Sequence, residues 1–162
     1  MLRRWRPDDV DQLTKIYASP AIVAWLGALT HSDAAATVAR YEHHWEMHGF
    51  GRFAVEDRRT GQLVGRVGVM RQPDWVETPH KDEVGWVVRA DRWAEGLATE
   101  AARAAIADAF DRVGLACVLS WTLPENIASR RVMEKCGLRF RGTADWKGQQ
   151  HVWYVSDEQA SD

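Results

Sequence analysis

The fold of this chain is decided by the stretch EVGWVVRADRWAEGLATEA, which occupies residues 83–101. Its first part, residues 83–88, is rich in β-branched and aromatic side chains, and this composition favours a β-strand. From Glu95 to Val113 the apolar residues recur with the i, i+3, i+4, i+7 spacing of an amphipathic helix, which Gly114 ends. The sequence therefore predicts a strand that turns directly into a helix.

The turn between this strand and this helix has the chemistry of an anion site. Small residues lie where the chain enters the helix, and Gly96 is one of them. Consecutive backbone N–H groups and the partial positive charge of a helix N-terminus can hold a pyrophosphate without any cationic side chain. A structural alternative is that Gly96 only relieves a tight turn. The sequence contains neither a Walker A loop nor a dinucleotide fingerprint, which argues against phosphate cleavage and hydride transfer.

The segments on either side of this stretch alternate between the two kinds of secondary structure. Before it, the patterns predict a strand at 2–6, a helix that Asp8 caps, a helix over 30–49 that Ser32 or Asp33 caps, and a hairpin of strands 52–56 and 63–70. After it, they predict a strand at 117–122, a helix at 126–136 closed by Gly137, and strands at 138–142 and 151–155 bracketing a loop. This order predicts the α+β class.

Length and composition indicate one globular domain. The chain has 162 residues, of which 46% are hydrophobic and 27% charged, so we expect a single domain over 1–156. From Ser156 onward the sequence is too polar to pack, and 157–162 form a polar tail. The net charge of -2 gives no overall attraction to nucleic acid or to an anionic membrane.

The termini and the cysteines suggest a cytoplasmic protein. The N-terminal residues are followed by polar ones rather than by the apolar stretch of a signal peptide, and no run reaches membrane-spanning length. The chain contains two cysteines, Cys117 and Cys136, which we interpret as reduced thiols. Cys136 occupies an apolar helix position, where buried packing is the ordinary outcome and a nucleophile is not.

Two motifs together resemble a known family. Residues 93–101, followed by NIASRRVMEKCGL at 126–138, resemble the GNAT superfamily of acyl-CoA-dependent N-acyltransferases. The resemblance is closest to the branch that contains the ribosomal-protein-alanine N-acetyltransferases, which similarly place a tryptophan at the head of the loop, and residues 2–9 resemble that branch's opening strand. It implies a GNAT-type fold, a splayed, mixed and mostly antiparallel seven-stranded sheet flanked by about four helices. It also implies acetyl-CoA as donor substrate, no metal, and a homodimer that no feature of the sequence itself demonstrates.

The resemblance also assigns residues to the donor site. The backbone around Val87 and Val88 would pair with the pantetheine arm, and a nearby N–H would polarise the thioester carbonyl. The side chain of Asn126 would contact the same arm, with Ser129 one helical turn later near the sulfur and Arg130 beside it. Simple helix capping is the alternative for Asn126 and Ser129. The loop expected to cradle the pyrophosphate consists of Trp93, Ala94, Glu95, Gly96, Leu97, Ala98 and Thr99.

Acetyl transfer requires a neutral amine, and this requirement points to a base. An α-amino group has a pKa of about 8 and a lysine about 10.4, so a base or a water relay must take a proton at neutral pH. Glu83, at the start of the strand, is the candidate; a solvated charge at a strand end is the alternative. Many family members have a tyrosine that protonates the departing thiolate, but Met133 holds the matching position here. Ser129 or solvent would then supply that proton.

The sequence leaves the acceptor open. Three interpretations are open. The acceptor is a protein N-terminal amine, or it is a small molecule such as an aminoglycoside or polyamine. Alternatively, the protein has no acceptor and is a non-catalytic acetyl-CoA sensor. Trp25 and Trp75 fall in predicted loops, with Trp75 expected to be exposed, and are candidates to line an amine-binding groove. His43, His44 and His48 lack the zinc-protease arrangement and a third ligand, so we interpret them as solvated or substrate-loop histidines.

Overall fold

One mixed sheet organises the molecule. The computed structural model describes residues 1–156, so the predicted tail at 157–162 lies outside the described residues. Seven strands follow the order β1-β2-β3-β4-β5-β7-β6, and neighbouring strands are antiparallel except for β4 and β5, which are parallel. The predicted α+β class and the mostly antiparallel sheet are confirmed. The strands are β1 (Leu2–Arg3), β2 (Arg52–Glu56), β3 (Leu63–Arg71), β4 (Asp82–Val88), β5 (Leu119–Thr122), β6 (Arg139–Trp146) and β7 (Gln149–Val155).

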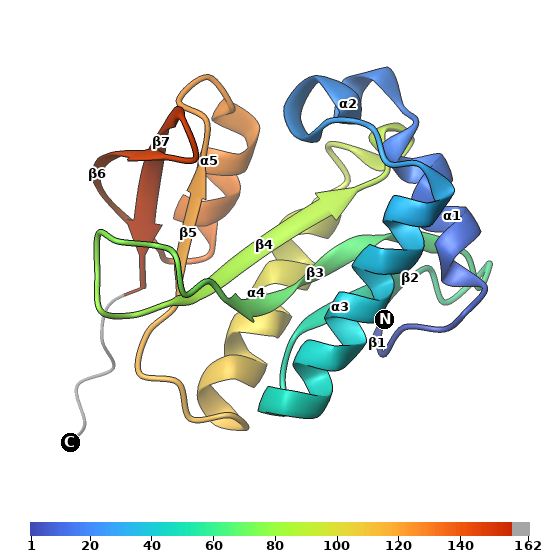
Figure 1. The fold of residues 1–162 in the computed structure, drawn as a ribbon, viewed down its shortest axis with the longest axis horizontal. Helices are drawn as coiled ribbons and strands as arrows, with labels where there is room; N and C mark the ends of the chain where they lie inside the picture. Colours follow the sequence, from blue (N-terminus) through green and yellow to red (C-terminus); the bar gives the residue numbers. More distant parts are fainter. Residues whose placement is uncertain (157–162) are drawn as a thin grey trace.

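The sheet is splayed between its two central strands. β4 and β5 are paired in register only at Glu83 and Leu119, after which they part (Figure 1). One half of the sheet consists of β1 to β4 and the other of β5 to β7. This gap matters for function, because the edge of β4 beyond Glu83 has no neighbouring strand to bond to.

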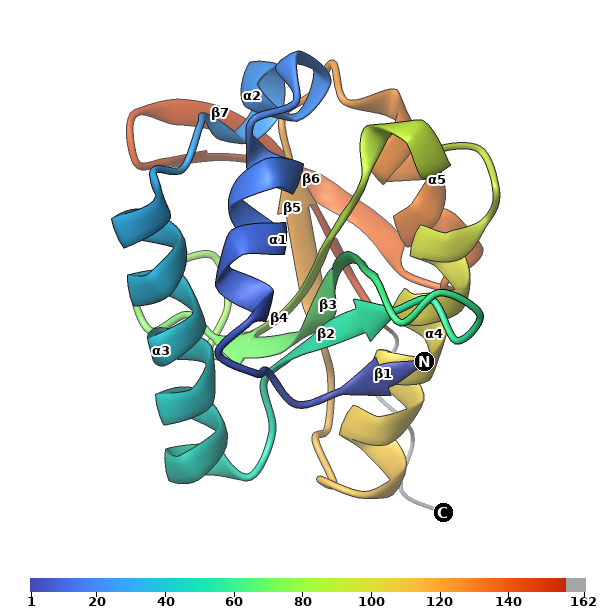
Figure 2. The same cartoon turned by 90° about the vertical axis from the view of Figure 1, so that its right-hand side faces the viewer.

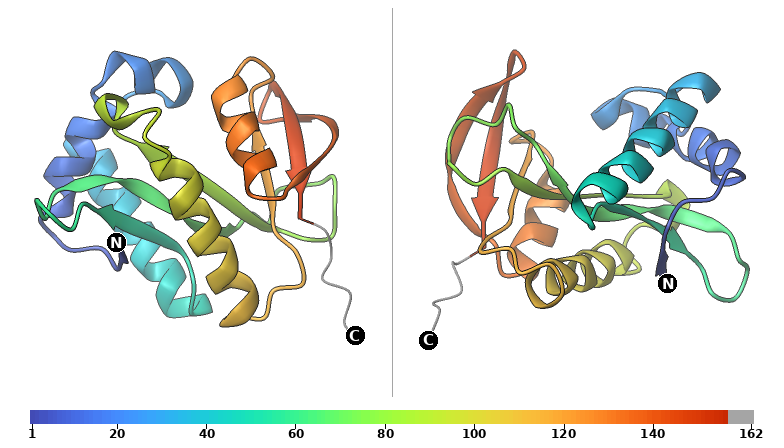
Figure 3. Two further views of the ribbon diagram at one scale, coloured as in Figure 1. Left: turned by 180° about the vertical axis from the view of Figure 1, so that it is seen from behind. Right: turned by 60° about the horizontal axis from the view of Figure 1, so that its bottom comes forward.

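Helices cover both faces of the sheet. α1 (Asp9–Tyr17) and α3 (His31–His48) lie on one face of the β1–β4 half, and α4 (Leu97–Asp111) lies on the opposite face (Figure 3). α5 (Ile127–Lys135) packs beside β5 and β6, and a short 3-10 turn, η1 (Ala90–Arg92), precedes α4. The placement of α4 directly after β4 and η1 confirms the predicted strand-to-helix turn.

The structure has one helix more than predicted. α2 (Pro20–Leu26) is only seven residues long, and it lies at the top of the molecule next to α1 (Figure 2). Its sequence PAIVAWL is apolar throughout and shows no clear helical period, which is why the sequence patterns did not predict this helix; the five α-helices of the described residues still agree with the expected fold of about four. Pro20 at the first turn begins the helix, and Gly27, with φ of 76°, ends it.

The N-terminal cap of α3 also differs from the prediction. Thr30, rather than Ser32 or Asp33, is the cap residue. The Thr30 hydroxyl accepts a hydrogen bond from the Asp33 N–H, and the Asp33 carboxylate accepts one from the Thr30 N–H at 3.0 Å. Asp33 therefore lies inside the helix as the third residue of a capping box, where its charge also favours the helix dipole.

Three further details of the predicted elements need correction. β1 stops at Arg3 rather than residue 6, because the Trp5 side chain turns inward and its Nε1 donates to the Arg52 carbonyl at 2.8 Å. The loop expected between the last two strands is a tight turn at Lys147 and Gly148, both with positive φ. Ser156 is buried, not too polar to pack: its Oγ accepts from the Val118 N–H at 3.0 Å.

Among residues 1–156, no helix has both the length and the apolar character that crossing a membrane requires.

Candidate active site

The free edge of β4 faces the gap. The Arg89 N–H donates to the Val64 carbonyl of β3 at 2.8 Å, and successive peptide groups of a strand point in opposite directions. The Val88 carbonyl and N–H therefore point away from β3, toward the gap with β5. The indole Nε1 of Trp93 donates to that carbonyl at 2.8 Å, so the tryptophan side chain folds back over the end of the strand. The Val88 N–H and the second lone pair of the carbonyl remain for a ligand.

The turn into α4 is built from left-handed residues. Ala94 has φ of 65° and Gly96 has φ of 82°, and the first intrahelical bond runs from the Glu100 N–H to the Gly96 carbonyl at 3.0 Å. The amides of Leu97, Ala98 and Thr99 consequently have no partner within the helix and face outward at its N-terminus. A Cβ on Gly96 would meet nothing within 4 Å, so the positive φ, and not crowding, makes glycine the preferred residue.

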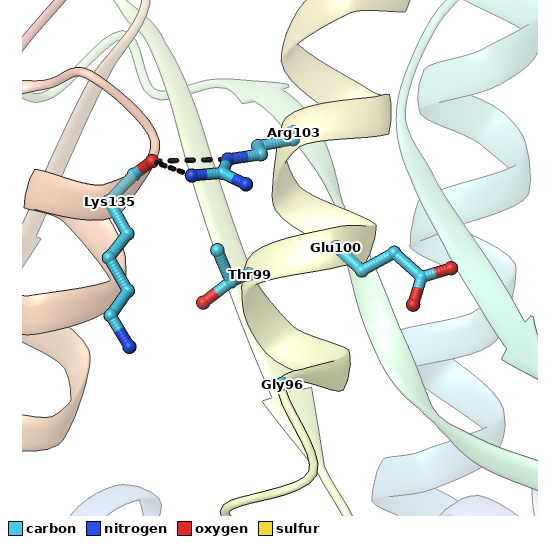
Figure 4. Close-up of a pocket in the computed structure, with 5 residues that line it drawn as sticks. All are labelled: Gly96, Thr99, Glu100, Arg103 and Lys135. Atoms are coloured by element: carbon cyan, nitrogen blue, oxygen red, sulfur yellow. Dashed lines mark hydrogen bonds between the residues drawn. The ribbon is translucent and has the colours of Figure 1, made fainter.

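A shallow pocket lies beside this N-terminus. It has a volume of about 470 Å³ and is lined by Gly96, Thr99, Glu100, Arg103 and Lys135 (Figure 4). Arg103 of α4 donates two hydrogen bonds, of 2.6 and 3.1 Å, to the backbone carbonyl of Lys135 at the end of α5. The Lys135 side chain extends from there toward the first turn of α4 (Figure 4). Two cations and a helix N-terminus thus surround one depression.

Sequence reasoning missed Arg103 and Lys135. They are 32 residues apart and meet because α4 and α5 pack side by side. Neither has a motif of its own that would have singled it out. Their pairing follows from tertiary packing alone.

The start of α5 supports the capping interpretation of its first residues. Asn126 is the N-cap, and its side-chain oxygen accepts from the Ser129 N–H at 3.1 Å. Arg130, on the same helix, donates to the Tyr154 hydroxyl and to the Pro124 carbonyl, each at 3.1 Å. Capping fixes where Asn126 and Ser129 lie but leaves the amide nitrogen of Asn126 and the hydroxyl of Ser129 outside the cap itself.

Glu83 is not a solvated charge, so that alternative was wrong. Its side chain is 9% exposed and forms an ion pair with Arg52 of β2. Arg52 reaches it across two glycines: it also hydrogen-bonds the carbonyls of Gly68 and Gly85, and a Cβ on Gly85 would collide with both partners of the pair. A buried carboxylate needs such a partner, because an unpaired charge in the interior is costly.

Two other predictions about the site's surroundings fail. Trp75 is fully buried rather than exposed: it stacks on Trp121 with ring centroids 4.3 Å apart and contacts Trp146 and Trp153 edge-on. An indole gains more from this aromatic cluster than from a solvated loop. Trp25, on α2 rather than in a loop, is 39% exposed.

His44 also departs from its prediction. It is buried, its Nδ1 lies 2.7 Å from the Phe50 carbonyl, and its Nε2 accepts from the Arg71 N–H at 3.0 Å. Burial lowers the pKa of His44, and only the neutral ring with its proton on Nδ1 satisfies both contacts. It is a structural residue that ties α3 to β3.

Cys136 packs against two core clusters, and burial raises the pKa of its thiol, which disfavours the nucleophilic thiolate. Among residues 1–156 no three histidine, cysteine or acidic side chains are grouped as a metal site would require.

Residues 1–139 match the family described as "Acetyltransferase (GNAT) domain". This chain belongs to the GNAT acetyltransferase family. In sequence, the GNAT protein is 27% identical to the uncharacterized protein YkkB of Bacillus subtilis (strain 168) over 140 residues, 84% of this chain and 80% of YkkB.

A further relative in sequence and two solved structures with the same fold accompany this match. FsC-acetyl coenzyme A-N(2)-transacetylase of Aspergillus fumigatus is 43% identical over 58 residues, 36% of this chain and 25% of that protein. The acetyltransferase from Agrobacterium tumefaciens str. C58 has a TM-score of 0.83 at 24% identity and covers 97% of this chain and 90% of its own. The aminoglycoside acetyltransferase AAC(6')-Ib, solved with coenzyme A, has a TM-score of 0.80 at 20% identity, covering 96% and 93%. The GNAT protein is therefore an acetyl-CoA-dependent N-acetyltransferase.

Proposed function

We propose that this N-acetyltransferase transfers the acetyl group directly from acetyl-CoA to a primary amine in a ternary complex, and that the amine is a protein N-terminus. The observation that carries the donor part of the proposal is the parting of β4 and β5 beside the open N-terminus of α4. A strand edge supplies amides for the pantetheine arm, and the helix supplies amides for the pyrophosphate.

The donor would be held mainly by main-chain groups. The loop from Trp93 to Thr99 would bind the pyrophosphate, with the positive charges of Arg103 and Lys135 near it. The backbone of Val88 would pair with the pantetheine arm, whereas the peptide groups of Val87, predicted to share this role, face β3. Asn126 and Arg130 would border the arm on the α5 side. This division suits a ligand with one anionic end and one amide-rich end.

The chemistry would begin with removal of a proton from the acceptor ammonium. One carboxylate oxygen of Glu83 is held by Arg52, and the other lies on the Gly85 side, so a water at that oxygen would carry the proton to Glu83. The amine nitrogen then attacks the thioester carbonyl carbon, and a β4 amide stabilises the negative charge that develops on the carbonyl oxygen. The C–S bond then breaks and the thiolate leaves, while the amide nitrogen, which carries two protons after the attack, loses one of them to water.

The proton for the departing thiolate would come from Ser129 or from solvent. Met133 is buried and carries no exchangeable proton. Ser129 lies one turn into α5, three residues after Asn126, on the side of the helix expected near the sulfur. A thiol has a pKa of about 8.5, so its thiolate is a tolerable leaving group even when only water protonates it.

The test uses two matched variants. Glu83→Gln should leave acetyl-CoA binding by calorimetry within about twofold of wild type and reduce turnover at pH 7 by about 10²- to 10⁴-fold, the usual contribution of a general base. Glu56→Gln is the control, because Glu56 is also buried and paired with an arginine, Arg3, but lies away from the gap. Unchanged turnover of Glu83→Gln would remove Glu83 as the base.

A panel of acceptors decides between the functions. Release of CoA with N-terminal peptides supports the proposal, and release with aminoglycosides or polyamines alone indicates a small-molecule enzyme. Acetyl-CoA binding without release of CoA on any amine indicates a sensor. Calorimetry that detects no binding of acetyl-CoA would refute all three.

A further inference from the structure

Besides Arg52, a second arginine, Arg66, lies beneath α1 and α2 and lacks a hydrogen-bond partner for one of its side-chain nitrogens. Arg66 of β3 donates from Nε to the Tyr17 hydroxyl at 3.0 Å, whereas its Nη1 is enclosed and makes no hydrogen bond. Among residues 1–156 only one other enclosed side-chain nitrogen, Nε1 of Trp75, is in this position. An enclosed donor without an acceptor is costly, and in a functional protein it calls for a ligand or an ordered water.

The charges around Arg66 do not balance. Glu83 is the carboxylate that acts on Arg66 electrostatically, but its ion pair is with Arg52. The other groups that act on Arg66 are the hydroxyls of Tyr17 and Tyr41, both buried. The carboxylate of Glu83 is thus already engaged by Arg52, and Nη1 of Arg66 is left without an oxygen acceptor.

Arg66 lies close to the free edge of β4. It is in register with Val87, the residue before Val88, so the two side chains occupy the same face of the sheet. Val87 belongs to one buried cluster with Tyr17 at the end of α1 and Ile22 of α2. Arg66 therefore lies on the α1–α2 side of the sheet, across from the residue next to the free edge at Val88.

The outer surface of α2 adds an apolar rim on this side of the sheet. Val23, Trp25 and Leu26 are 36, 39 and 51% exposed, and the helix carries no charged residue. α2 lies near the end of β4 toward which the gap opens (Figures 1 and 2). An acceptor entering here meets apolar side chains first and an arginine within.

We propose that Arg66 binds a carbonyl or carboxylate oxygen next to the acceptor amine and thereby selects α-aminoacyl compounds. This inference rests on the proposed function and deepens it. A peptide N-terminus or an amino acid amide has such an oxygen two bonds from its amine-bearing carbon, and an apolar side chain would lie against α2. Aminoglycosides and polyamines carry several positive charges and no carbonyl oxygen beside the amine, so two arginines disfavour them.

The test compares two amines that differ by one group. Leucinamide and 3-methylbutylamine share the side chain, but the second lacks the carboxamide. For each, kcat/KM is measured by CoA release in wild type and in Arg66→Met. Arg66→Met should lower kcat/KM for leucinamide about tenfold or more, the effect of a lost hydrogen bond to a charged group, and leave 3-methylbutylamine within about twofold. For each amine, kcat/KM of the variant is divided by kcat/KM of wild type. The difference in pKa between the two amines cancels in these ratios, because it is the same for both proteins.

Controls separate recognition from folding. Arg58→Met, in the exposed turn between β2 and β3, should change neither amine. Arg66→Lys keeps the positive charge but not the planar set of N–H donors, so it should lose part of the preference for leucinamide. If thermal unfolding shows that Arg66→Met does not fold, Arg66→Lys takes its place in the test. Calorimetry of N-acetyl-leucinamide with the CoA-loaded protein gives a second readout that needs no turnover: wild type should bind it at least tenfold more tightly than the Arg66 variants.

Several outcomes would overturn the inference. These are an equal loss for both amines, no loss for either, equal binding of the acetylated product by all proteins, or a wild-type preference for spermidine or kanamycin over leucinamide. Its failure differs from that of the proposed function. Loss of acceptor selectivity with acetyl-CoA binding intact refutes only the role of Arg66, whereas absence of acetyl-CoA binding refutes the proposed function.

Discussion

The most direct test of the donor site uses two glycines that both have a positive φ. Gly96 at the start of α4 has φ of 82°, and Gly61 in the turn between β2 and β3 has φ of 68°. A Cβ on either would meet nothing within 4 Å. Valine at each position therefore suffers the same left-handed strain, about 1–2 kcal/mol, without a steric collision in the free protein. Each variant should melt roughly 2–8 °C lower than wild type, at about 2–4 °C per kcal/mol for a chain of this size.

Binding of acetyl-CoA should separate the two variants. The branched side chain of Gly96→Val projects beside the amides of Leu97, Ala98 and Thr99 and keeps an anion away from them. Loss of two hydrogen bonds to a charged group costs about 3–6 kcal/mol, at roughly 1.5–3 each. The Kd measured by calorimetry should then rise by roughly 10²- to 10⁴-fold for Gly96→Val, since each 1.4 kcal/mol is about tenfold. Gly61→Val should bind as wild type does.

The reasoning fails if folded Gly96→Val binds acetyl-CoA as tightly as Gly61→Val. In that case the amides at the start of α4 do not hold the diphosphate, and Gly96 only relieves the turn.

Two further predictions concern stability. Trp75→Ala should lower the free energy of unfolding by about 3–5 kcal/mol in a denaturant titration, because it empties the centre of the aromatic cluster. Trp75→Phe should lower it much less, since the enclosed Nε1 makes no hydrogen bond that phenylalanine would lose. An equal loss of stability in both variants would contradict this prediction. Because burial lowers the pKa of His44, the unfolded chain binds a proton before the folded one does, and stability should fall as pH drops below about 6.5. Denaturant titrations from pH 7.5 to 5 should show this loss in wild type and in the exposed control His43→Gln, and a smaller loss in His44→Gln; identical pH profiles would refute the role of His44.

Local sequence patterns predicted most of the elements correctly. The strand-to-helix turn at 83–101 has a composition and a periodicity that short-range physics decides, and the hairpin of β2 and β3 follows from alternation and turn residues. α2 was missed because a short apolar helix without a polar face has no period to detect. The exposure of Trp75 was predicted wrongly because its neighbours along the chain are mostly polar, whereas the aromatic side chains that bury it come from distant strands.

The sequence was sufficient to indicate the family and to predict the donor loop and Glu83 as the candidate base, because these depend on residue types at short spacing. Only the tertiary structure decided which charges meet. Arg52 pairs with Glu83 from 31 positions away, Lys135 reaches the pocket at Gly96, and Arg66 is left with an enclosed nitrogen beneath α1. The physical reason is that register between strands and packing between helices bring together side chains whose separation along the chain carries no signal, and electrostatics acts only over the resulting distances.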